Sequence, residues 1–271
     1  MIRDITIGQY FRTNSLLHRM DPRVKIVGTL VYAVSLFFIK DYISFAVAAV
    51  CFCFIVRLSR VPFRFIIKGL KPVFVMLLFT AVLQLLCTSG DDLVHFGIVH
   101  ITIQGVHQSV FMLFRLTLLI MGSSMMTLTT TPNQLTDGIE KLLRPLNHIR
   151  VPVGDLAMTM SIALRFIPIL IEELDKIMKA QLARGADLES GNLIQRLKNM
   201  VPLLVPLFSS AIRRANELAY AMDARCYHGG KGRTKMKPLQ YTQRDYVTYM
   251  VIFLYVAGLV IVAYGKAWIV S

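Results

Sequence analysis

The chain has 271 residues, 55% of them hydrophobic, and a formal net charge of +14 at pH 7. Such apolarity, concentrated in long uncharged runs, is rare in soluble domains and indicates an all-α membrane protein. The positive charge does not indicate nucleic-acid binding, because no aromatic and basic stacking platform is visible and basic residues normally collect in the cytoplasmic loops of membrane proteins.

Five apolar runs predict about five transmembrane helices. The first run is short, only about 21 Å long as a helix, and Lys40-Asp41 separates it from the second run by a tight turn. The runs cover residues 26–39, 42–56, 72–88, 106–131 and 246–264.

The loop charges predict the orientation of these spans. The N-terminus, the 57–71 loop and residues 132–243 are rich in Lys and Arg, whereas the 89–105 loop has none. Basic loops stay in the cytoplasm, so we expect a multi-pass protein of the cell membrane with a cytoplasmic N-terminus and its C-terminus outside. The predicted parts are a four-span membrane part (1–131), a cytoplasmic module of amphipathic helices (132–243) and a last span (244–271).

Within the cytoplasmic module, a proline in the first turn predicts a short helix from Pro132, ended by Pro145. A second helix is expected from about Val153, with an apolar stripe at steps of three and four and a kink at Pro168. It should end at Ala183-Arg184-Gly185, since glycine suits the left-handed position just past a last turn.

A third helix is expected from about Arg196 to Ala224-Arg225-Cys226. It has one small residue per turn on one face, which lets another helix approach closely. The second and third helices are therefore expected to cross near Ala211, Ala215 and Ala219.

Both helices end in Ala-Arg followed by a small residue. Taken singly, Arg184 and Arg225 complement the negative end of a helix dipole or contact phospholipid. Their repetition at two helix ends favours a second interpretation, a pair of equivalent contacts with a partner that has two equivalent grooves. Arginine suits such a contact because its planar fork pairs bidentately with carboxylates or caps exposed carbonyls.

Three segments together resemble the transmembrane T component of energy-coupling factor transporters, the vitamin and metal-ion importers of prokaryotes. The resemblance covers essentially the whole chain. Its N-terminal signature spans residues 15–25, its first coupling segment spans 163–185, and its second Ala-Arg-Gly motif corresponds to residues 224–226.

The resemblance implies a non-enzymatic scaffold without catalytic residues, metal or cofactor. Two long coupling helices would dock their ends on two ATP-binding-cassette ATPases and cradle a membrane-embedded substrate-binding S component. The docking residues would be Ala183, Arg184, Gly185, Ala224, Arg225 and Cys226; the crossing or S-component contacts would be Ala211, Ala215, Ala219 and Pro168. No nucleic-acid partner is implied, and no Walker-type phosphate loop occurs in the sequence.

The second motif departs from the family pattern, because Cys226 occupies the usual glycine position. Cysteine enters the left-handed region at a greater cost than glycine. We therefore expect the chain to leave this helix by a different turn, or the helix to continue into Tyr227.

Two other functions stay open at the level of sequence. A self-sufficient permease would need intramembrane acidic residues or discontinuous helices at the midplane, and neither is evident. A membrane-embedded metal enzyme would draw on His95, His100 and His107 beside Asp91 and Asp92, although their spacing matches no zinc motif.

Overall fold

The computed structural model describes residues 10–39, 41–88, 91–96, 99–186, 192–229, 236 and 238–270. The chain divides into two compact units: one includes Ile139–Pro238, and the other consists of Gly8–Gly138 with Leu239–Ser271. The predicted turn at Lys40, most of the polar loop after Ala186 and the basic residues 231, 233, 235 and 237 lie outside the described residues.

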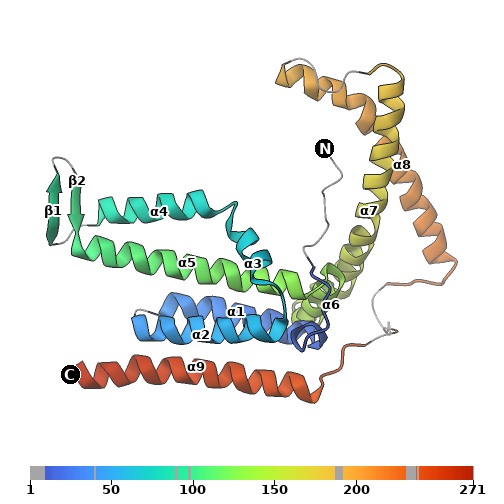
Figure 1. Ribbon diagram of the computed structural model, residues 1–271. Coiled ribbons are helices and arrows are strands. Elements are labelled where there is room, and N and C mark those ends of the chain that lie inside the picture. Colours follow the sequence, from blue (N-terminus) through green and yellow to red (C-terminus); the bar gives the residue numbers. More distant parts are fainter. Residues whose placement is uncertain are drawn as a thin grey trace. The chain divides into compact units, whose positions relative to one another are not determined.

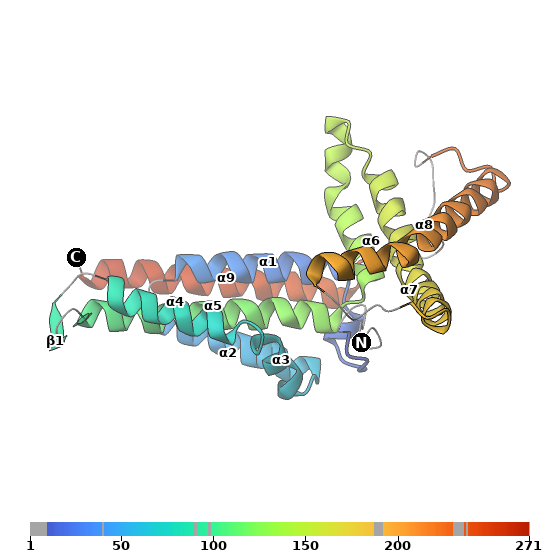
Figure 2. The same ribbon diagram turned by 90° about the horizontal axis from the view of Figure 1, so that it is seen from above.

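The larger unit is a bundle of roughly parallel helices that run side by side in both views (Figures 1 and 2). Its buried core is apolar and includes Leu36, Ala48, Phe52, Phe111 and Met125. A short 3-10 helix, Leu17–Arg19, precedes the bundle. The helices are α1 (Pro22–Phe38), α2 (Tyr42–Ser59), α3 (Phe63–Leu70), α4 (Phe74–Cys87), α5 (Ile103–Thr129) and α9 (Gln243–Val270).

The segment between α4 and α5 contains a β-hairpin where the sequence predicted only a loop. Strands β1 (Asp92–Phe96) and β2 (Val99–Thr102) pair antiparallel, with a register irregularity between Asp92 and Val94. The fold remains all-α in class, because this hairpin is the only sheet among the described residues.

Four described helices are long and apolar enough to cross a membrane, or up to five if the bent pair α3–α4 counts as one span. The four are α2, α5, the first twenty residues of α9 and α7 (Val153–Ala183). This number agrees with the predicted count, but the set differs. α1 has 17 residues, fewer than the roughly 20 of a typical span, whereas α7 qualifies although the sequence placed it in the cytoplasm.

The smaller unit contains the two long helices that the sequence predicted, α7 and α8 (Leu193–Asp223), which pack against each other. α7 is continuous through Pro168. The chain reaches α7 through α6 (Pro132–Leu143), which begins with a proline as predicted, and a 3-10 helix at Arg144–Ile149.

Arg115, the only arginine inside the apolar run of α5, has a structural role. Its Nη2 donates a 2.8 Å hydrogen bond to the carbonyl oxygen of Ile39, at the C-terminal end of α1. The last carbonyls of a helix have no partner within the helix, so a cation there satisfies one of them. This hydrogen bond therefore joins α5 to the end of α1.

Candidate functional site

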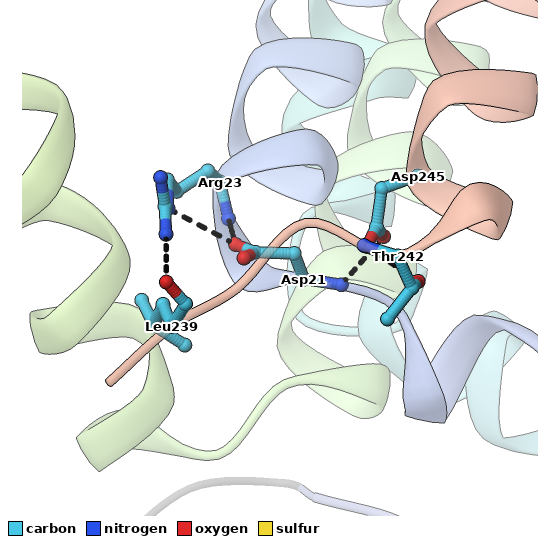
Figure 3. A network of polar contacts seen from close by, with 5 residues as sticks. All are labelled: Asp21, Arg23, Leu239, Thr242 and Asp245. Carbon is cyan, nitrogen blue, oxygen red and sulfur yellow. Dashed lines mark hydrogen bonds and ion pairs between the residues drawn. The ribbon is translucent and has the colours of Figure 1, made fainter. Parts of the chain in front are cut away.

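The N-terminal signature folds into a polar knot at one end of the bundle (Figure 3). Asp21 caps α1, because its carboxylate accepts a 2.9 Å hydrogen bond from the backbone N–H of Arg23. The backbone N–H of Asp21 donates in turn to Asp245 Oδ1, also at 2.9 Å. The starts of α1 and α9 are therefore joined by a direct hydrogen bond.

Asp245 also closes the first turn of its own helix. Its Oδ2 accepts from the backbone N–H of Thr242 at 2.8 Å and from the Thr242 hydroxyl at 2.7 Å. The bond from the Thr242 N–H to the third residue of α9 is one half of a capping box. The Thr242 hydroxyl donates to the same carboxylate, and the Asp245 N–H donates to the Thr242 carbonyl oxygen instead of to the hydroxyl. Asp245 is 1% exposed, so its charge is compensated by these donors rather than by water.

Arg23 attaches the segment that enters α9 to this knot. Its Nη2 donates to the Leu239 carbonyl oxygen at 2.8 Å, and its Nε lies 3.4 Å from Asp21 Oδ1. The guanidinium also lies over the ring of Tyr241, 4.4 Å from the ring centroid. Because the planar fork makes three kinds of contact at once, lysine would not replace it.

His18 and Lys25 extend the knot toward the end of α5. The Lys25 ammonium is buried and donates to the Thr129 carbonyl oxygen at 3.0 Å. His18 Nδ1 lies 2.7 Å from Ser15 Oγ, and its Nε2 lies 2.9 Å from the Phe11 carbonyl oxygen. Burial lowers the pKa of His18, and the Lys25 charge lowers it further, so the neutral ring is favoured.

Sequence reasoning recognised Asp21, Arg23 and Lys25 in the signature but missed Asp245. A signal was present, because Thr242-Gln-Arg-Asp245 has the spacing of a capping box before an apolar run. The pairing with Asp21 could not be found in this way, since the two residues are 224 positions apart.

The first predicted docking end is a complete Schellman turn. Gly185 has a φ of +82°, and the N–H of Ala186 donates to the Gln181 carbonyl oxygen at 3.0 Å. The N–H of Gly185 donates to the Leu182 carbonyl oxygen, also at 3.0 Å. These are the two bonds that define this helix ending.

The second predicted docking end has the same geometry, contrary to the expectation drawn from Cys226. Cys226 has a φ of +55°, and the N–H of Tyr227 donates to the Met222 carbonyl oxygen at 3.1 Å. The N–H of Cys226 donates to the Asp223 carbonyl oxygen at 2.9 Å. The chain therefore neither leaves the helix by a different turn nor continues as a helix. The two hydrogen bonds outweigh the free-energy cost of a non-glycine residue in the left-handed region, about 1–2 kcal/mol.

Arg184 and Arg225 therefore occupy equivalent positions, each directly before the left-handed residue of its turn. Both arginines are exposed, and so are Ala183, Gly185, Ala224 and Cys226. An exposed guanidinium on a fixed turn can form paired hydrogen bonds with a carboxylate or with backbone carbonyls of another protein.

The contact between α7 and α8 includes an ion pair beside the predicted row of alanines. Arg214 Nη2 lies 3.2 Å from Glu173 Oε2, and on α8 the buried Leu203 and Ser210 share the face of Arg214 at helical spacing. Of the predicted small residues, Ala211 is partly buried, whereas Ala215 and Ala219 are exposed, as is Pro168 of α7. The crossing at the three alanines stays a prediction.

Replacement of Cys226 by glycine is expected to be neutral or mildly stabilising, by up to about 1 kcal/mol. Glycine adopts the φ of +55° without strain, while its greater freedom in the unfolded chain offsets part of the gain. Cys226→Val is expected to destabilise the turn, since a β-branched residue is the worst choice at positive φ. Thermal unfolding and hydrogen exchange at the Tyr227 amide measure both effects; equal exchange in the two variants would contradict the turn.

The helices and charges described above define the class of the protein as a multi-pass membrane protein whose smaller unit has two exposed helix ends. The family model of the cobalt transport protein CbiQ matches residues 13–236. Curated relatives named energy-coupling factor transporter transmembrane protein EcfT match over nearly their full length. One from Clostridium kluyveri is 53% identical over 249 residues, covering 91% of this chain and 92% of the relative.

A relative of the same name from Thermosediminibacter oceani is 49% identical, covering 95% of this chain and 97% of the relative. One from Bacillus subtilis is 46% identical, covering 90% and 93%. The chain belongs to this family of transmembrane components of energy-coupling factor transporters, which are transport proteins and not enzymes.

The alternative metal site finds no support among the described residues, where no group of three His, Cys, Asp or Glu side chains converges on one point. His107 packs between aromatic rings, 4.6 Å from Phe111 and 4.9 Å from Tyr42 between ring centroids. The side chains of His95 and His100 lie outside the described set.

Proposed function

We propose that this chain is the energy-coupling scaffold of an importer for a micronutrient, a vitamin or a metal ion. It binds two ATP-binding-cassette ATPases through the ends of α7 and α8 and transmits their movement to a membrane-embedded S component that carries the substrate. The observation that carries the proposal is the identical turn that presents Arg184 and Arg225. Two equivalent contacts suit a pair of equivalent ATPase subunits.

The apolar surface of α7 and α8 supports a further membrane partner. Both helices expose large hydrophobic side chains that no described residue of their own unit covers, and exposed apolar surfaces of this kind mark interaction sites. We assign this surface to the S component. The exposed residues include Met160, Ile167, Val205, Phe208, Ile212 and Tyr220.

The proposed setting is the cell membrane, with the N-terminus and the α7–α8 module in the cytoplasm and the C-terminus outside. The basic 57–71 loop and the basic residues near α8 support this orientation. In this setting the two arginines reach cytoplasmic ATPases.

Gentle purification of the tagged full-length chain from its native membrane, followed by mass spectrometry, tests the proposal. Two ATP-binding-cassette polypeptides, or two copies of one, should co-purify together with a small multi-pass membrane protein. Purification of the chain alone, with substrate uptake by vesicles that contain only this chain, would overturn the scaffold function and favour a permease.

Ala215→Trp is expected to impair substrate uptake strongly while the chain keeps its stability. The side chain of Ala215 is exposed, so a large ring costs the isolated chain less than about 0.5 kcal/mol. In the complex, the ring would keep the S component away from α8. Uptake assays paired with thermal unfolding separate the two effects, and wild-type uptake by the variant would exclude Ala215 from the contact surface.

A further inference from the structure

A cavity of about 660 Å³ lies within the larger unit, lined by α1, α2, α5, α9 and the segment that precedes α1. It is more than four times larger than an engineered cavity of about 150 Å³ that holds benzene. On α1 the lining follows a single helical face, with Lys25, Gly28, Thr29 and Tyr32 at steps of three and four.

The two ends of the cavity differ in polarity. One end carries Lys25, Thr129, Gln243, Arg244 and Thr248, next to the polar knot. The remaining walls are mostly apolar and come from all four helices, with Thr29, Tyr32 and Tyr255 as the side chains that carry hydroxyls. The walls include Val24, Phe52, Ile55, Met125, Val251 and Ile252. A ligand that matches this lining has a polar, anionic head and a long apolar tail.

Arg244 is the cation available at the polar end. The Lys25 ammonium is already committed to backbone carbonyls, and both carboxylate oxygens of Asp245 accept hydrogen bonds from Asp21 and Thr242. Arg244 lines the cavity with an exposed side chain. It therefore supplies net positive charge where a ligand head would lie.

Tyr32 provides an independent sign that the cavity takes a ligand with oxygen atoms. This residue lines the cavity, is 8% exposed, and its hydroxyl is buried without a hydrogen-bond partner among the described residues. Unpaired buried hydroxyls are costly. Tyr32 lies two helical turns after Lys25, and side chains of a helix lean toward its N-terminus. The Tyr32 hydroxyl therefore lies between the charged end of the cavity and its apolar depth.

The cavity also opens laterally, between α2 and α9. Phe54 of α2 and Val247 and Val251 of α9 line the cavity and are also exposed. An acyl chain can enter between these helices from the bilayer, without passing through the charged end.

From the charge at Arg244, the orphan hydroxyl of Tyr32 and the lateral opening, we propose that the cavity binds an anionic phospholipid. Its phosphate pairs with Arg244 and one acyl chain fills the apolar depth. A small shift of the Tyr32 ring then lets its buried hydroxyl donate to an ester carbonyl. This site is distinct from the ends of α7 and α8 and does not depend on the proposed function. Basic residues at the cytoplasmic side of a bilayer meet the leaflet in which anionic lipids collect.

Delipidated full-length chain in detergent, titrated with phosphatidylglycerol or phosphatidylcholine and analysed by native mass spectrometry, tests the site. The wild-type chain should bind one phosphatidylglycerol saturably and in preference to phosphatidylcholine. Arg244→Gln should reduce this preference about fivefold, the equivalent of about 1 kcal/mol. Arg57→Gln, an exposed arginine of α2 outside the lining, is the matched control and should keep the preference.

Val251→Trp should block the opening and lower the binding of both lipids, whereas Phe253→Trp, two residues further on α9 and outside the lining, should not. Val251 is 47% exposed and Phe253 is 72% exposed, so both variants are expected to fold. Tyr32→Phe should weaken phosphatidylglycerol binding without loss of thermal stability. Equal lipid binding by Val251→Trp and Phe253→Trp, or an unchanged preference in Arg244→Gln, would overturn the proposal. So would the absence of saturable binding, which would leave the cavity to a helix of a partner protein.

Discussion

The double variant Arg184→Glu with Arg225→Glu is expected to abolish co-purification of ATPase subunits with this chain. Both arginines precede the left-handed residue of a Schellman turn and are exposed. Hydrogen bonds to a charged group contribute about 1.5–3 kcal/mol each, and charge reversal adds repulsion from the acidic or carbonyl groups of the groove. Each single variant should weaken the complex by one to two orders of magnitude, and the pair should remove it.

The matched control is the double variant Lys176→Glu with Arg213→Glu. It makes the same charge change on exposed residues of the same two helices, away from their ends. Quantitative pull-down of the ATPases at constant ionic strength measures both pairs. If the control double variant also failed to retain the ATPases, general electrostatic attraction would explain the association, and the two turns would not be docking sites.

Asp245→Ala is expected to destabilise the membrane unit by about 2–4 kcal/mol, a large effect for one side chain. The substitution removes the acceptor of three hydrogen bonds, one from Asp21 and two from Thr242. It leaves the N–H of Asp21 buried without a partner and removes the cap of α9. Asp245→Asn should destabilise the unit less than Asp245→Ala, because the amide oxygen can still accept a hydrogen bond. Some destabilisation remains, since the amide NH2 group then faces the Thr242 donors.

Asp155→Ala is the control for this prediction, since Asp155 also lies in the first turn of a long helix but is exposed. Its loss should cost less than about 1 kcal/mol. Thermal unfolding of the purified chain in one detergent compares the three variants. A melting temperature of Asp245→Ala equal to that of Asp155→Ala would show that the knot does not hold α1 and α9 together.

Local signals in the sequence were sufficient to predict the helices of the smaller unit. Proline at the start of α6, glycine after α7 and the apolar stripe between them act within a few residues, so they can be recognised without knowledge of the fold. The β-hairpin was missed because its strands are only five and four residues long and lie in a segment that reads as an outer loop. Short strands give a weak periodic signal.

The contacts that depend on distant residues could not be predicted. The ion pair from α8 to α7 comes from Arg214, one residue before Ala215 of the predicted row. Small residues allow close packing on any side, so they do not decide which side faces a neighbour. The turn at Cys226 was also missed. The residue type indicates the free-energy cost of a left-handed cysteine, but it does not show the hydrogen bonds that offset this cost.

The attachment of Leu239 to Arg23 limits how far the end of α8 can travel. Only the twelve residues from Tyr227 to Pro238 separate the α8 turn from this anchored carbonyl. A fully stretched chain of that length reaches about 45 Å. The polar knot therefore fixes one end of this linker, and a displacement of the α8 end beyond that reach would pull on the first turn of α9.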